Sequence, residues 1–559
     1  MESVLREHGC TAHRAQLGAS VRRRGGSTSG SPPLAPLQPI RPAARRRGPV
    51  ALQTSKLPSS QRAASSIQDI LKTVFSKSPK VAKGTSMYVS LPPSAFTHTG
   101  QLAYPQALVH GLAALKCGGV DGVVVPVVWG LVEGEGPQQY DFTVYKELAE
   151  MLRKCGLKMQ VSIEFSVVKG LSELPRWLLK IGETDPNIFF QDQYGNILLD
   201  CLSMGVDTVP AIGGRTGQQV YSDLMCAFRD AFVDDLGGLI EEVAVGMGPH
   251  GELRYPSYPA GKWHFPGVGE FQCYDSHMLT GLQEAARQAG HPASFGERGP
   301  ADAGHYCSNP QDTAFFKDSG TWKTDSGEFF LQWYSGELLR HGDIMLDTAR
   351  QVFGGEVVLG MKIPVVHWWH HTQSRAAELT AGIYHTAEHS GYEDLIDLAA
   401  KYSAFVQVSC AEMSDRHQSS QAKCSPERIL ALIREAASRK SVFVGLSNCD
   451  MRFDDSAMTK LSSSALDPAF ADTTMSVSFV HMSDELFKGY QWGKFTALAS
   501  KFSRDDIETS TPVPAQPAED GEEKEKDAPL QPTRPMVGAY TPFFSYSVMS
   551  LINSSSNKE

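Results

Sequence analysis

The sequence predicts an α/β protein, a (β/α)8 TIM barrel with long loops over its C-terminal mouth. From about residue 84, short runs rich in β-branched residues alternate with amphipathic stretches. This alternation is typical of repeated βα units that form a parallel sheet. The runs are numerous enough to close a barrel, and they lie near residues 86–91, 121–129, 158–165, 241–247, 356–367, 405–410, 441–446 and 475–481. Such barrels can exceed 400 residues when their loops carry insertions, so one large domain accounts for most of the 559 residues.

Helical patterns separate several of the predicted strands. The clearest lie at 141–156, 222–239 and 426–439. Ser425 is the expected N-cap of the last helix, because Pro426 follows it at a position that tolerates proline. The stretch 249–332 is rich in Gly, Pro and aromatic residues and is expected to form an elaborated loop region over the barrel mouth.

The two ends of the chain differ from the predicted barrel, which covers residues 84–503. Residues 1–83 are predicted to be a plastid transit peptide and a disordered segment, because arginine triplets stand among Ser, Ala, Pro and Gly with few acids. Residues 504–535 are acidic and Pro-rich, which predicts disorder. The remaining segment, 536–559, contains aromatic and aliphatic residues that could dock on the barrel.

Composition excludes several classes of function. A net charge of −10 and a pI near 6.0 argue against nucleic acid as a partner, since binding a polyanion requires a basic surface. No apolar run reaches the length of about 20 residues that spans a bilayer, so no membrane association is expected. The ten cysteines form no CxxC pair and no Cys/His cluster at metal-ligand spacing. We therefore predict no metal site, no cofactor and no disulfide framework.

The segment GMGPHGELRYPSYP (246–259) follows a predicted strand and contains Glu252. On a barrel this glutamate lies at the C-terminal mouth, where catalytic carboxylates occur. The alternative is an ion pair with the nearby Arg254, a more common role for a single glutamate.

A second strand end, MKIPVVHWWHH (361–371), contains Lys362, His367, Trp368 and Trp369. Aromatic faces stack on pyranose rings, and fixed polar groups bind sugar hydroxyls. These residues are therefore candidates for sugar binding. Ordinary packing of two large aromatic side chains in the core is the alternative.

Together, these segments resemble the plant β-amylases of glycoside hydrolase family 14. The resemblance covers about residues 84–500 and rests on several long blocks in the same order. Besides 246–259, they are GVDGVVVPVVWG (119–130), GPQQYDF (136–142), FPGVGEFQCYD (265–275), FFLQWYSGELLRHGD (329–343), HWWHHTQSRAAELTAGIY (367–384) and CAEMSD (410–415).

The resemblance implies an inverting exo-hydrolase that releases maltose from the non-reducing ends of α-1,4-glucans. Inversion uses one carboxylic acid to protonate the leaving oxygen and a second carboxylate to activate water. By resemblance the acid is Glu252. The family places its base in a Gly-Glu-Asn-Ala-Leu stretch, whereas this chain has FVGLSNCDMRFDD from residue 443. If the two stretches are matched at Gly445, Leu446 takes the position of the base. If they are matched at Arg452-Phe453, Ser447 takes it. Asp450 is the nearest acid.

Other positions at which the family binds or covers its substrate are also changed. The family's glucose-binding aspartate becomes Pro126, and a substrate-binding arginine becomes His481. The lid after the third strand is shortened to FSVVKGLSELPRW (165–177) and lacks the family's histidine. The first Trp of the family's Trp-Trp-Gly is Val128, and an inner-loop threonine becomes Ser409, which keeps a hydroxyl for substrate binding. The family positions that are retained are Glu252, Lys362, His367, Trp368, Trp369, Cys410 and Glu412.

The chain is most similar to the inactive plastidial members of the family. We therefore predict a catalytically inactive β-amylase-like protein that regulates starch degradation in the plastid stroma, with Glu252 as a vestigial acid. Its expected partners are starch-pathway proteins and, weakly, α-1,4-glucan. One alternative is an active β-amylase in which Asp450 or another carboxylate serves as the base. A nuclear transcription regulator of this family is disfavoured, because residues 1–83 are too short and irregular in composition for a DNA-binding module.

Overall fold

The computed structural model describes residues 85–386 and 389–502. The predictions for segments 1–83, 504–535 and 536–559 lie outside these residues. Within them, no helix is long and apolar enough to cross a membrane.

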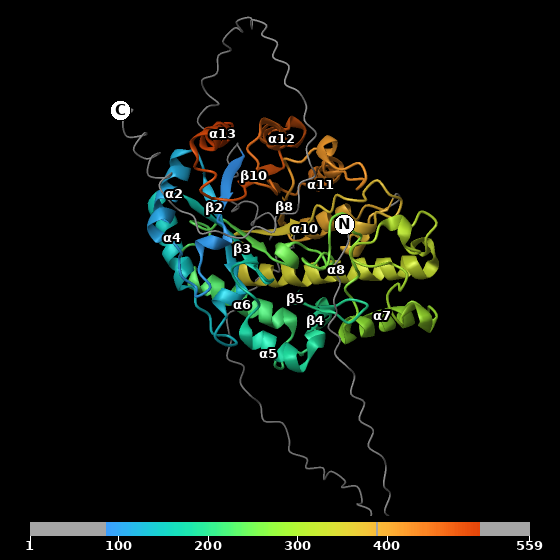
Figure 1. The fold of residues 1–559 in the computed structure, drawn as a ribbon. Coiled ribbons are helices and arrows are strands. Elements are labelled where there is room, and N and C mark those ends of the chain that lie inside the picture. The colour runs from blue at the N-terminus through green and yellow to red at the C-terminus, as the bar shows by residue number, and fades with distance from the viewer. Residues whose placement is uncertain (1–84, 387–388, 503–559) are drawn as a thin grey trace, which may run out of the picture. The chain divides into compact units, whose positions relative to one another are not determined.

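Eight parallel strands close into a barrel in the order β1-β10-β9-β8-β7-β6-β3-β2 (Figure 1). Pairing of β1 with both β10 and β2 completes the ring. Each strand coincides with one predicted from the sequence, so the predicted fold class is confirmed. The strands are β1 Ser86–Ser90, β2 Gly122–Val128, β3 Lys158–Glu164, β6 Glu242–Val245, β7 Val358–Ile363, β8 Phe405–Val408, β9 Val444–Ser447 and β10 Thr474–Phe479.

Helices follow the barrel strands and surround the barrel (Figure 1). Every residue of β10 and all but the first residue of β3 are buried, as expected for parallel strands covered on both faces. The α-helices are α2 Pro105–Cys117, α3 Trp129–Val132, α4 Thr143–Cys155, α5 Arg176–Thr184, α6 Gly217–Ala231, α7 Ser276–Gln288, α8 Asp325–Phe353, α9 Ala376–Thr380, α10 Gly391–Lys401, α11 Pro426–Lys440, α12 Asp455–Ala465 and α13 Gly489–Ala499.

The hydrogen bonds at two helix N-termini test the helix predictions. α6 begins and ends earlier than the predicted range 222–239, and Thr216 and Gln219 form a reciprocal capping box at its N-terminus. Ser425 is the N-cap residue of α11 and Pro426 follows it at N1, as predicted. The Ser425 hydroxyl makes no capping hydrogen bond, because it donates to Asp415 Oδ2 at 2.7 Å.

The loop region predicted at 249–332 contains regular structure. α7 lies inside it, capped by Asp275, whose carboxylate accepts from the amides of His277 and Met278. α8, a helix of 29 residues, begins at Asp325. The elaborated region therefore includes helices that the sequence did not single out, while residues 252–275 and 296–320 contain no α-helix or strand.

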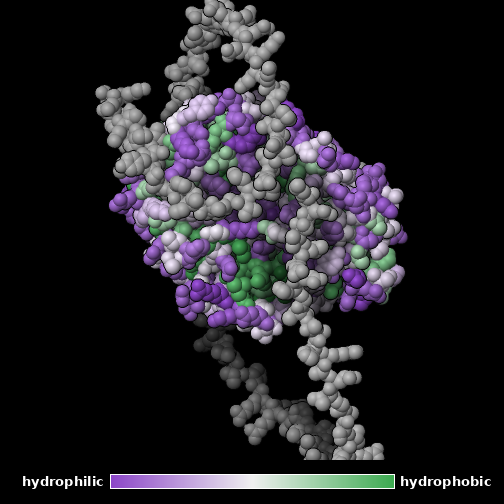
Figure 2. Space-filling model, viewed as in Figure 1, coloured by the Kyte–Doolittle hydropathy of each residue, from purple (hydrophilic) through white to green (hydrophobic). Residues whose placement is uncertain are grey.

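A two-stranded hairpin, β4 Phe189–Gln191 and β5 Ile197–Leu202, lies outside the barrel ring. Tyr194, Ile197 and Leu199 of this hairpin are exposed, unlike most large apolar side chains of the described chain. The face seen in Figure 2 is a mixture of hydrophilic and hydrophobic areas.

Candidate functional site

Glu252 lies at the mouth of the barrel, just beyond β6. It forms a parallel bridge with Lys362 of β7, and the Leu253 amide donates to the Lys362 carbonyl at 3.0 Å. The turn before it, Pro249–Gly251, brings the chain close to β3 and β7. Gly251 has φ +78°, and a Cβ there would lie 2.6 Å from Glu164 Oε2. Only glycine fits this turn, which fixes where Glu252 emerges.

The carboxylate of Glu252 is paired with Arg254. Arg254 Nε lies 2.7 Å from Glu252 Oε2, and the two side chains are only 11% and 22% exposed. Arg254 also donates to the Tyr255 carbonyl. The ion pair suggested by the sequence therefore exists, but it lies at the barrel mouth and is largely withdrawn from solvent. The Arg254 guanidinium binds one of the two Glu252 carboxylate oxygens through which a catalytic acid would donate its proton.

Lys362 pairs with Glu164, a carboxylate at the end of β3 that the sequence reasoning missed. Lys362 Nζ lies 2.5 Å from Glu164 Oε1, and the Ser162 hydroxyl donates to the same oxygen at 2.6 Å. Lys362 also donates to the His250 carbonyl at 3.3 Å. Glu164 could have been singled out as the acidic last residue of a predicted barrel strand, the position where such barrels place functional groups.

No acidic residue stands on β9, where the family base is expected. Leu446 is fully buried in the hydrophobic core and pairs with Val408 of β8. Ser447 is 7% exposed and pairs with Ser478 of β10. Neither side chain can accept a proton from water as a carboxylate does.

The loop after β9 is held by Asn448. Its amide nitrogen donates to the carbonyls of Asp450 and Val480, and its oxygen accepts from the Val480 amide at 2.8 Å. Asp450 follows as the first acid after β9, with its own amide donating to Glu412 Oε1.

Trp368 and Trp369 are buried, at 8% and 7% exposure. The Trp368 indole donates to the Gly267 carbonyl at 3.0 Å, and the Trp369 indole donates to the Pro266 carbonyl. Trp368 also contacts the ring of Tyr258, with centroids 4.9 Å apart. This geometry matches the packing role that the sequence left open as the alternative to sugar stacking.

His367 and Ser409 complete the set of predicted binding residues. Burial lowers the pKa of His367 to about 4, which leaves the imidazole neutral near pH 7. Its Nδ1 has no hydrogen-bond partner within the described chain. The Ser409 hydroxyl contacts Cys410 Sγ at 3.6 Å. Both residues are partly exposed.

The shortened lid folds as a compact turn. The Ser172 amide donates to the Val168 carbonyl at 3.0 Å, and the amide of Val168 donates in return to the Ser172 carbonyl. Beside it, a cavity of about 30 Å³ is lined by Ser166, Val167, Lys169, Asp200, Pro249, His250, Arg254, Pro256, Tyr258, Pro259 and Ala260. A volume of this size holds a few waters.

The sequence model of Glycosyl hydrolase family 14 matches residues 88–508. The chain belongs to this family. Among plant relatives, "Beta-amylase 2, chloroplastic" of Oryza sativa subsp. japonica is 38% identical over 435 residues, covering 76% of this chain and 78% of the relative. A β-amylase of Medicago sativa is also 38% identical and covers 76% of this chain and 88% of the relative. Family 14 membership therefore extends across the barrel.

A solved structure agrees with this fold. The catalytic domain of β-amylase from Paenibacillus polymyxa matches with a TM-score of 0.63 at 22% identity, covering 75% of this chain and 99% of that domain. At that identity the likeness establishes the (β/α)8 architecture alone. The chemistry of this chain depends on its own residues.

Proposed function

We propose that this protein is a family 14 barrel without hydrolytic activity that acts in plastid starch degradation by binding. The observation that carries this proposal is the end of β9, where Leu446 and Ser447 stand in place of a carboxylate. General-base catalysis typically contributes about 10²–10⁴ in rate, and inversion has no second route to activated water.

The state of the other mouth residues supports the same conclusion. Glu252, the vestigial acid, is bound to Arg254, and the compact lid leaves a cavity of about 30 Å³ beside it. Trp368 and Trp369 are packed under the loop that contains Pro266 and Gly267. A glucan chain would have to displace this loop, so its binding is expected to be weak.

Starch-pathway proteins are the proposed main partners, with α-1,4-glucan as a weaker ligand. Two rice relatives and one from Arabidopsis thaliana have "chloroplastic" in their names, which supports a plastid location for this chain. The Arg-rich, acid-poor segment 1–83 supports it independently. Fusion of this segment to a fluorescent protein should direct the fusion into plastids, and a mitochondrial signal would contradict the assignment.

The decisive experiment is a maltose-release assay on soluble starch with the purified full chain, run beside a plant β-amylase. No release above the blank is expected. The alternative, an active enzyme with Asp450 as base, predicts release that both Glu252→Gln and Asp450→Asn abolish. Pull-down from plastid extract, compared with co-sedimentation on starch, then measures the binding role. Retention of neither glucan nor any starch-pathway protein would contradict it.

A further inference from the structure

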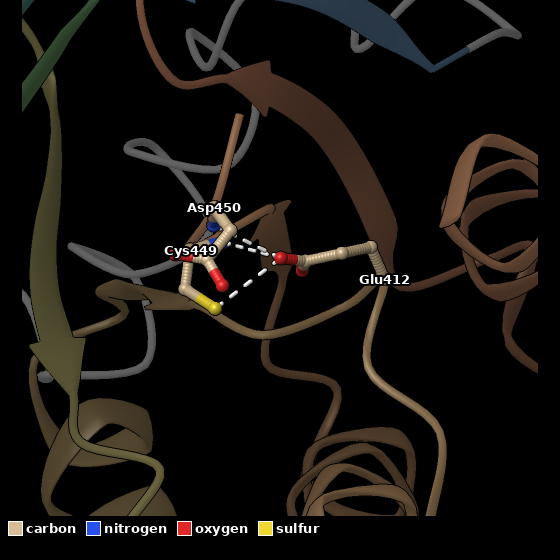
Figure 3. Close-up of side chains that lie close together, drawn as sticks. All are labelled: Glu412, Cys449 and Asp450. Carbon is tan, nitrogen blue, oxygen red and sulfur yellow. Dashed lines mark hydrogen bonds between the residues drawn. The ribbon is translucent and has the colours of Figure 1, made fainter. Parts of the chain in front are cut away.

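Three potential metal ligands converge at the mouth of the barrel, on the loops after β8 and β9. Glu412, Cys449 and Asp450 each offer one donor atom, and these atoms all lie within 4.8 Å of one another. Figure 3 shows the Glu412 side chain reaching across from its own loop toward Cys449 and Asp450. Among the described residues, no other three His, Cys, Asp or Glu side chains have donor atoms this close together.

Glu412 is held in place through one of its two oxygens. Its Oε1 accepts from the amides of Cys449 and Asp450, both at 3.0 Å, and from the Cys449 thiol at 3.2 Å. Its Oε2 is buried and has no hydrogen-bond partner, although the residue is only 4% exposed. A buried carboxylate oxygen without a partner is costly, so an additional ligand at this oxygen would stabilise the site.

Cys410 lies two residues before Glu412, on the same loop after β8. Cys410 has φ +65°, an uncommon conformation for a residue with a side chain. Strained backbone of this kind tends to occur where a side chain must be held in a specific position.

The cluster lacks a protein cation. In the described chain, none of the lysine and arginine ion pairs includes Glu412 or Asp450; the nearest pairs in sequence are Arg452 with Asp454 and Lys460 with Glu427. Two carboxylates and one thiol therefore share one site without a lysine or arginine ion-pair partner. Cys449 and Asp450 are exposed, which leaves a path for an ion from solvent.

We propose that Glu412, Cys449 and Asp450 bind a thiophilic divalent cation of the Zn²⁺ type. One thiolate and two carboxylate oxygens, with a water in the fourth position, form a set that suits Zn²⁺, whereas Mg²⁺ and Ca²⁺ prefer oxygen ligands alone. The Cys449 thiol loses its proton to solvent as its sulfur–metal bond forms, so binding releases a proton and strengthens as the pH rises. The ion would link the loops after β8 and β9, beside the position where the family base is missing.

The test is calorimetric titration of the full chain with Zn²⁺, with its thiols kept reduced by a phosphine and any bound metal first removed by a chelator. One ion per chain is expected. Cys449→Ser, Glu412→Gln and Asp450→Asn should each weaken binding at least about tenfold. Cys307→Ser, which removes an exposed thiol elsewhere, serves as the matched control and should leave the affinity unchanged. Titration with Co²⁺ should produce a thiolate charge-transfer band that is lost in Cys449→Ser.

Circular dichroism of each variant confirms that the barrel is intact, so that lost binding is not lost folding. The proposal is overturned if the reduced wild-type chain binds no Zn²⁺. It is equally overturned if the variants bind as well as the wild type, or if the Co²⁺ spectrum shows no thiolate band.

Discussion

Two regions of the barrel mouth differ in what their side chains offer. At the ends of β6 and β7, Glu252, Lys362 and Trp368 are each engaged by a neighbour in the folded protein. On β9, where the resemblance leads us to expect the base, the chain has Leu446 and Ser447 and no acid.

The comparison shows that Lys362 and Trp368 have structural partners of their own. Lys362 neutralises the buried Glu164, and the Trp368 indole binds the Gly267 carbonyl, so both stabilise the fold without any substrate. A base carboxylate has no comparable structural partner to preserve it, because general-base catalysis needs an oxygen free to reach water. Loss of activity would therefore remove the base first and leave the packed residues in place.

The strongest test of this contrast places a carboxylate on β9. Leu446→Glu puts an ionisable group into the apolar core and should lower the free energy of unfolding by about 4 kcal/mol or more. Ser447→Glu should be tolerated better, because Ser447 lies at the end of the strand. Neither variant should release maltose, since Pro126, His481 and the compact lid remain. Urea denaturation and a reducing-sugar assay measure the two effects, and robust turnover by either variant would show that only the base was missing.

Truncation of Trp368 separates packing from sugar binding. Trp368→Ala should cost about 3–5 kcal/mol of unfolding free energy, as for other buried aromatic side chains. Leu199→Ala is the control, since Leu199 is 51% exposed and its loss should change stability by less than about 0.5 kcal/mol. A Trp368→Ala protein of unchanged stability but reduced retention on starch would assign the indole to sugar binding instead.

The ion pair at the ends of β3 and β7 allows a double-mutant cycle. Lys362→Met leaves Glu164 buried without its cation and should destabilise the protein by about 3 kcal/mol. Adding Glu164→Gln to Lys362→Met should recover part of that loss, because the unpaired charge is then removed. Chemical denaturation of the two single variants and the double variant measures the coupling. Strictly additive effects would mean that the two charges are not coupled in the folded protein.

The opposite end of β6 provides the smallest expected effect. Burial raises the pKa of Glu242 to about 7, against hydrogen bonds from Gln160 and Tyr88 that lower it. Between pH 4.5 and 7 the unfolded chain ionises this group while the folded chain keeps it protonated, so stability falls across that window. Glu242→Gln should therefore raise the free energy of unfolding by about 2 kcal/mol at pH 8 and change it little at pH 4. Equal effects in urea denaturation at the two pH values would contradict this assignment.

The candidate site was only partly predictable. The sequence placed Glu252 and Lys362 correctly at strand ends, because parallel barrel strands present their C-terminal ends to one mouth. It missed Glu164, whose importance depends on a lysine on another strand. It also argued against a metal site, since the cysteines show no ligand spacing, while the fold brings Glu412 beside Cys449 from 37 residues away.

The sequence by itself determined the barrel and the absence of an acid on β9. Strand periodicity and residue identity are local properties, and both can be read without coordinates. Only the tertiary structure decided that Arg254 holds Glu252, that the Trp368 and Trp369 indoles bind loop carbonyls, and that Glu412 meets Cys449. Those contacts join segments that are distant along the chain or depend on rotamers. Closure of the ring and packing of side chains fix such arrangements. No short stretch of the sequence specifies them by itself.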